Sequence, residues 1–172
     1  MKAKAKAKTF PETLWELLGL APRTKRPPTT AGVGRGRTAT HARYDALVVQ
    51  MKRTYGIRVR KWRRSTTGCA WVVRYSDGAE SRLIEAPYPT GPVSCAVFLH
   101  EVGHHAIGFS SCRLRCLEEY HAWQWALNEM RARNLNVTDR VQRRMTESLR
   151  YALRKARSRG LKTLPEELRP FL

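Results

Sequence analysis

Two histidines that could bind one metal ion flank a glutamate in the segment His100-Glu101-Val102-Gly103-His104. On a helix, residues i and i+4 lie one above the other, so both imidazoles can face the same ion. Glu101 lies further round the helix, where its carboxylate can reach a water on the ion without ligating the ion itself. Zinc lowers the pKa of a bound water to about 7, so this chemistry suits neutral pH. We therefore predict a zinc site with His100 and His104 as ligands and Glu101 as the catalytic base.

A third ligand is expected on the following helix. Glu119 comes far enough after His104 for a loop and a returning helix. Glu118 is the nearest alternative and His121 a weaker one. Two imidazoles and one carboxylate leave the fourth position of a tetrahedral zinc open, as in catalytic sites. The predicted ligand set is thus His100, His104 and Glu119.

A helix and three short strands are predicted ahead of this motif. Apolar residues recur at helical spacing from Tyr44 to Tyr55, and Gly56 suits the end of that helix. Turn residues separate the strand-like runs that follow, and such short connections favour an antiparallel or mixed sheet. The predicted strands are Ile57–Trp62, Cys69–Tyr75 and Arg82–Ala86.

Three helices are expected after the sheet, which makes the class α+β. The first carries the zinc motif over about Ser94–Ile107, and the second carries Glu119 over about Arg113–Arg133. Thr138 can cap the third, a long C-terminal helix that ends at Gly160. The outer faces of this last helix are crowded with cations: Arg140, Arg143, Arg144, Arg150, Arg154, Lys155, Arg157 and Arg159.

The first 40 residues differ from the rest in composition. Residues 1–8 form a basic Lys-Ala tail, and Thr9–Glu12 has the spacing of a capping box that opens a short amphipathic helix. Residues 21–40 are rich in Pro, Gly, Thr and Arg, as in a flexible linker. We expect residues 1–40 to be a tail, helix and linker, and residues 41–172 to be the catalytic domain. The short helix could dock on a partner or occupy the cleft as a prosegment.

Basic residues strongly outnumber acidic ones. The 172 residues include 33 Lys and Arg against 14 Asp and Glu, a formal net charge of +19. This excess attracts polyanions, so we expect a nucleic-acid partner, with a merely solubilising basic surface as the alternative. The chain has no sequence-reading motif, which favours non-specific binding. Trp62, between basic residues, is the best candidate for base stacking, whereas Trp123 is expected in the core.

Neither a membrane nor a secretory pathway is indicated. No run approaches the about 20 apolar residues of a membrane span, and the basic N-terminus lacks the apolar core of a signal peptide. Four cysteines do not make a dense disulfide framework, so a cytoplasmic location is expected. Cys69 and Cys95 fall on predicted core elements. Cys112 and Cys116 are either structural thiols like these or a redox-labile pair.

The two predicted metal-binding helices resemble a known family. His100-Glu101-x-x-His104, followed by Glu119-x-x-Ala122, is similar to the gluzincin metallopeptidases, and most to the minigluzincins and the ImmA/IrrE-type peptidases. The resemblance implies a zincin-like fold, peptide-bond hydrolysis and Glu119 as third ligand. Trp123 stands where that family has an asparagine that orients a ligand histidine, so another group must do this here.

The resemblance also implies how a substrate would bind. In such enzymes the edge strand of the sheet holds an extended peptide by backbone pairing, and Gly68–Tyr75 is one candidate for that strand. A donor must also stabilise the oxyanion. The candidates are His105, Tyr120, His121, Tyr151 and the arginines of the last helix.

A more distant resemblance, in motif, size and charge, is to the SprT-like proteases that digest proteins crosslinked to DNA. The resulting hypothesis is a zinc-dependent endopeptidase whose protein substrates are associated with nucleic acid or are a specific regulator. The alternative is a basic nucleic-acid-binding or regulatory module with a zincin-like fold, whose zinc site is structural or vestigial. The sequence leaves the oligomeric state open.

Overall fold

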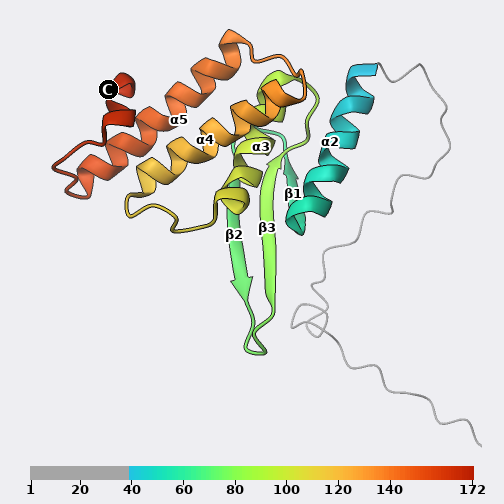
Figure 1. Cartoon of the computed structure of the whole chain (residues 1–172), viewed down its shortest axis with the longest axis horizontal. Coiled ribbons are helices and arrows are strands. Elements are labelled where there is room, and N and C mark those ends of the chain that lie inside the picture. Colours follow the sequence, from blue (N-terminus) through green and yellow to red (C-terminus); the bar gives the residue numbers. More distant parts are fainter. Residues whose placement is uncertain (1–38) are drawn as a thin grey trace, which may run out of the picture. The chain divides into compact units, whose positions relative to one another are not determined.

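A computed structural model describes residues 39–172 of the chain (Figure 1). The predicted basic tail, short helix and most of the linker lie outside the described residues. The described elements are α2 (Ala39–Tyr55), β1 (Ile57–Arg63), β2 (Cys69–Arg74), β3 (Glu80–Pro87), α3 (Pro92–Ile107), α4 (Arg115–Ala132), α5 (Asp139–Ser158) and a short 3-10 helix, η1 (Glu166–Phe171). The predicted α+β class with a small three-stranded sheet is confirmed.

The sheet is mixed, and its strand order is β1-β3-β2. The central strand β3 pairs in parallel with β1 and antiparallel with β2. Strands β2 and β3 form a hairpin in which Gly78 adopts a φ of 84°, a left-handed conformation that suits glycine. Strand β2 is thus an edge strand, and within residues 39–172 it pairs with β3 alone.

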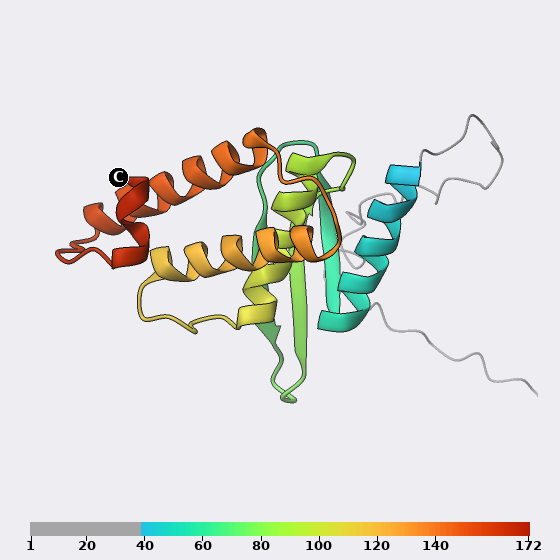
Figure 2. The ribbon, with the colours of Figure 1, turned by 45° about the horizontal axis from the view of Figure 1, so that its top comes forward.

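Helix α3 forms the centre of the fold, because every residue from Cys95 to His105 along it is buried. It packs against β3 and β2 on one side and against α4 on another. Gly91 and Ser94 fix its start, since the Ser94 hydroxyl accepts a hydrogen bond from the Gly91 amide at 3.1 Å. Helices α4 and α5 run antiparallel beside each other in both Figure 1 and Figure 2. The helix start at Thr138 is as predicted: its hydroxyl accepts from the Val141 amide at 3.4 Å.

Gly103 lets α3 and α4 approach closely. A Cβ at this position would lie 2.9 Å from the carbonyl oxygen of Ala122 and 3.1 Å from the Trp125 ring. No larger residue fits between these helices without moving one of them. The close approach matters for function because the two helices carry the predicted metal ligands. None of the helices in the described part of the chain is long and apolar enough to cross a membrane.

Candidate metal centre

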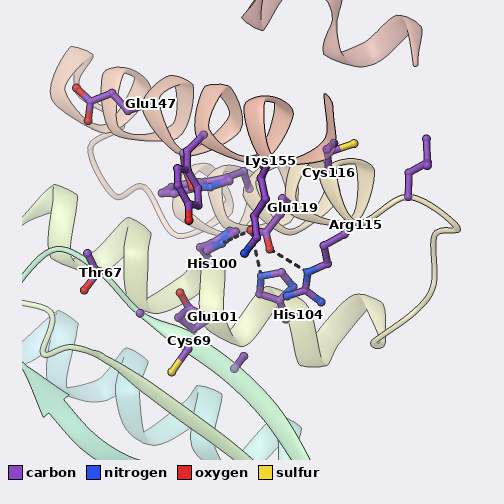
Figure 3. A pocket seen from close by; sticks show the side chains of 18 of the residues that line it. Thr67, Cys69, His100, Glu101, His104, Arg115, Cys116, Glu119, Glu147 and Lys155 are labelled. Atoms are coloured by element: carbon purple, nitrogen blue, oxygen red, sulfur yellow. Dashed lines mark hydrogen bonds and ion pairs between the residues drawn. The ribbon is translucent and has the colours of Figure 1, made fainter. Parts of the chain in front are cut away.

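Three predicted ligands meet between α3 and α4. The Nε2 atom of His100 lies 3.2 Å from the Glu119 carboxylate, and Nε2 of His104 lies 3.6 Å from it (Figure 3). Their ligand atoms all lie within 4.8 Å of one another. The histidines share one face of α3, as their i, i+4 spacing predicted, and Glu119 comes from the facing turn of α4. This group could hold a metal ion.

The protonation of His100 and Glu119 also fits a metal. At His104, by contrast, burial is outweighed by the neighbouring Glu119, which raises the pKa, so that imidazole must lose a proton when a metal binds. Burial lowers the pKa of His100 to about 4, so its imidazole is neutral with a nitrogen lone pair to donate. Burial alone would raise the pKa of Glu119, but hydrogen bonds from His100 and His104 outweigh it and hold that pKa well below its ordinary value. A neutral imidazole nitrogen and an ionised carboxylate oxygen are the donors that zinc and similar divalent ions prefer.

Glu101 lies beside this group without belonging to it. Its side chain is buried and points toward the cavity, and a Cβ on Gly68 would lie only 2.4 Å from its Oε1 atom. Burial raises the pKa of Glu101 to about 8, against the lowering effect of the neighbouring His104. Gly68 precedes strand β2, so this glycine brings the sheet edge against the predicted base. Sequence reasoning had given Gly68 no role of its own beyond a turn and the start of a strand.

Glu118, the alternative ligand, faces the other nitrogen of His104. Its Oε1 lies 3.4 Å from His104 Nδ1, in ion-pair range but without the alignment of a hydrogen bond. Arg115 donates to the same oxygen at 2.6 Å, and the Ser110 amide donates to Oε2 at 3.2 Å. Glu118 is therefore a buried, fixed carboxylate behind His104. It stands where the sequence analysis required some group to orient a ligand histidine.

Aromatic side chains hold the rings of both histidines. Trp123 is fully buried, as predicted, and its ring stacks on His100 with centroids 4.4 Å apart. The guanidinium of Arg144 lies 5.9 Å from the Trp123 ring centroid and donates to the Thr66 carbonyl at 3.1 Å. The ring of Phe109 stacks on His104. These contacts fix the orientation of both imidazoles through packing.

A cavity of about 840 Å³ opens onto the candidate centre. Its walls are the start of β2, the metal-binding parts of α3 and α4, and the inner face of α5 with the segment after it. Among the predicted oxyanion donors, Tyr151, Arg144 and Arg159 line this cavity. His105 instead donates to the Leu83 carbonyl on the sheet side at 3.1 Å.

Tyr120, proposed as a donor, and His121, proposed as a donor and as a ligand, lie elsewhere. The Tyr120 ring contacts the rings of His121 and Phe171, and neither Tyr120 nor His121 lines the cavity. Trp62 is 38% exposed, but its ring packs edge-on against Tyr88 with centroids 4.8 Å apart. It is therefore only partly available for stacking on a base.

All four cysteines are free thiols in the structure. Cys95 and Cys116 are buried, whereas Cys69 and Cys112 are partly exposed. Burial raises the pKa of Cys95 to about 12 and makes this thiol unreactive.

Comparison of the chain with protein-family models, with characterised proteins and with solved structures finds no match. The interpretation of the site therefore depends on its own residues. Two imidazoles, one carboxylate and a second, protonatable carboxyl group meet at the bottom of an open cavity.

Proposed function

We propose that this protein is a zinc-dependent endopeptidase and that residues 41–172 form a zincin-like domain. The observation that carries the proposal is the convergence of His100, His104 and Glu119 within 4.8 Å, beside the buried carboxyl of Glu101. A structural zinc site is closed by four protein ligands, whereas three ligands facing a cavity leave a position for water or substrate. A carboxyl group at Glu101 would have no purpose in a purely structural site.

Each residue has a defined task in peptide hydrolysis. Bound zinc would supply a Lewis acid that polarises the scissile carbonyl and makes water more acidic. Glu101 takes a proton from the attacking water on its carboxylate and delivers it to the leaving amine nitrogen. Burial raises the pKa of Glu101 to about 8, so this carboxyl can hold the proton that it takes from the water until the amine leaves. Trp123 and Glu118 keep the imidazoles of His100 and His104 in place.

Strand β2 offers the substrate a place to bind. Its free edge begins at the cavity, where Thr67 to Ala70 line the wall next to Glu101. An extended peptide could add to this edge by main-chain hydrogen bonds, which would place its backbone beside the metal centre. Tyr151 and Arg144 line the same cavity and are candidate donors to the oxyanion.

The proposal is tested by metal content and proteolysis together. The full chain should bind one zinc per molecule and cleave a denatured protein, with fragments identified by mass spectrometry. Glu101→Gln should keep the zinc and lose cleavage by at least about 100-fold, the lower range for one general base. Cleavage that persists in Glu101→Gln, or the absence of zinc from the pure protein, would refute the proposal.

A second candidate is a nucleic-acid-binding or regulatory module whose zinc site is structural or vestigial. The basic outer face of α5 favours it, because within residues 39–172 its arginines form no ion pair with an acidic side chain: Arg140, Arg143, Arg150, Arg154 and Arg157. The two candidates combine if the enzyme acts on proteins associated with nucleic acid. Cleavage measured with and without DNA separates them. DNA binding without any Glu101-dependent cleavage supports the module alone.

A further inference from the structure

The lining of the cavity is rich in positive charge. Arg113, Lys155, Arg159 and Lys162 line it, and none of these cations has an acidic partner among residues 39–172. Two other lining cations are held by polar partners: Arg115 pairs with Glu118 and Glu119, and Arg144 donates to the Thr66 carbonyl. Lys155 has a ring contact instead, because its Nζ atom lies 5.9 Å from the Tyr151 ring centroid. The lining carboxylates are Glu101 and Glu119 at the floor and Glu147 on α5.

Lys155 lies across the metal centre from the strand edge. In Figure 3, Lys155 extends from α5 toward His100 and Glu119, while Thr67 and Cys69 lie on the opposite side. Both sides line the same cavity. In an extended peptide paired with β2, alternate side chains point to opposite sides. Side chains on one side of such a peptide would therefore meet Lys155 and its neighbours.

This arrangement suits an acidic peptide better than a nucleic acid. The buried Glu101 and the partly buried Glu119 lie at the cavity floor, where the proposed zinc ion would offset their charge, so the preference for a peptide depends on the strand edge rather than on repulsion of phosphates. A peptide can lay its neutral backbone over that floor and direct a single carboxylate toward α5. The unpaired edge of β2 also matches peptide amides and carbonyls rather than phosphates.

We propose that the cavity selects peptides that carry an Asp or Glu side chain facing α5, with Lys155 as its principal partner. This specificity rests on the proposed endopeptidase function. It names the substrate class that the same site would take. It differs from the general attraction of a basic protein for polyanions, because it assigns the preference to exposed cations that line this cavity.

The test uses peptides in which a single Asp is moved along a Ser-Ala chain, each matched by a version with Asn. Binding is measured by fluorescence anisotropy to the full-length Glu101→Gln protein with and without zinc, so no cleavage is needed. At low salt the best Asp peptide should bind about two- to fivefold more tightly than its Asn match, as expected for one partly exposed ion pair. Lys155→Glu in the same background should reverse the preference in favour of a Lys peptide.

The matched control is Arg154→Glu. It makes the same change of charge on the same helix, but Arg154 does not line the cavity. Arg154→Glu should keep the preference for Asp, and Lys155→Gln should abolish the preference without reversing it. Thermal unfolding of each variant checks that the fold is intact.

Three results would overturn the proposal. The first is equal binding of the Asp and Asn peptides, and the second is an equal loss of the Asp preference in Arg154→Glu and Lys155→Glu. The third is a single-stranded oligonucleotide that displaces the Asp peptide and whose own binding weakens as much in Lys155→Glu. The enzyme proposal fails separately. If the Asp peptide binds selectively but the wild type cleaves nothing, the peptidase proposal is refuted and the preference for acidic peptides stands. If the wild type cleaves protein without preferring Asp peptides, the preference is refuted and the peptidase proposal stands.

Discussion

Substitution of Gly68 by alanine should impair catalysis without removing the metal. The added Cβ would lie 2.4 Å from Oε1, 2.6 Å from Cγ and 2.7 Å from Cδ of Glu101. Non-bonded carbon atoms normally lie about 3.5–4.0 Å apart, so the Glu101 carboxyl must retreat by about 1 Å. A displacement of about 1 Å can cost about 100-fold in rate. Because Glu101 is flexible, the cost in stability should be only that of a poorer side-chain conformation, about 0.5–1.5 kcal/mol.

The assay compares cleavage of a denatured protein, zinc affinity and urea unfolding for wild type and Gly68→Ala. We expect kcat/KM to fall by about 100-fold while the zinc dissociation constant stays unchanged. Gly91→Ala is the control, since a Cβ there meets no atom within 4 Å and should leave the rate almost unaltered. Gly68→Ala activity within about twofold of wild type would refute the placement of Glu101 as the base. A parallel loss of zinc would show instead that the substitution damages the site as a whole.

Four further substitutions test the rest of the structure. Glu119→Ala should abolish tight zinc binding, while Glu118→Gln should raise the zinc dissociation constant by about 10- to 100-fold. Isothermal titration that shows a larger loss of zinc affinity in Glu118→Gln than in Glu119→Ala would contradict this assignment. Gly103→Ala should lower the free energy of unfolding by about 1–3 kcal/mol, because the new Cβ meets an α4 carbonyl oxygen at 2.9 Å, and unchanged urea unfolding would argue against this close approach. The folded-state pKa of Cys95 is raised to about 12 from 9.0, so its stabilising contribution is complete below pH 9 and is lost as the pH rises toward 12. Between these values that thiol should remove about 1.4 kcal/mol of stability per pH unit, and Cys95→Ala should show a correspondingly shallower alkaline decline in stability.

The parts of this fold that depend on local spacing could be predicted. The positions of His100, Glu101 and His104 follow from helical periodicity alone. The start of α5 follows from the capping side chain of Thr138. The strand order could not be predicted, because the parallel pairing of β1 with β3 joins segments separated by all of β2. Pairing of this kind depends on tertiary packing rather than on the composition of either strand.

The choice between two adjacent glutamates was harder to derive. Glu118 and Glu119 are neighbours on α4, so which of them faces the histidines depends on how α4 is rotated against α3. That rotation is fixed by non-local contacts such as Gly103 against Ala122, which periodicity does not encode. The sequence favoured Glu119 as a ligand by its distance from His104, and the family resemblance pointed to the same residue. It gave no indication that Glu118 supports His104 from behind.

The open edge of β2 has a consequence for how this protein behaves in concentrated solution. A strand with unpaired amides and carbonyls can accept a strand from another copy, which leads to association and precipitation. Two copies that approach edge to edge each carry a formal charge of +19 and repel each other. Salt shortens the range of this repulsion to about 3 Å at 1 M. The excess of positive charge thus helps to keep the peptide-binding edge free, and the protein should self-associate more readily as the ionic strength rises.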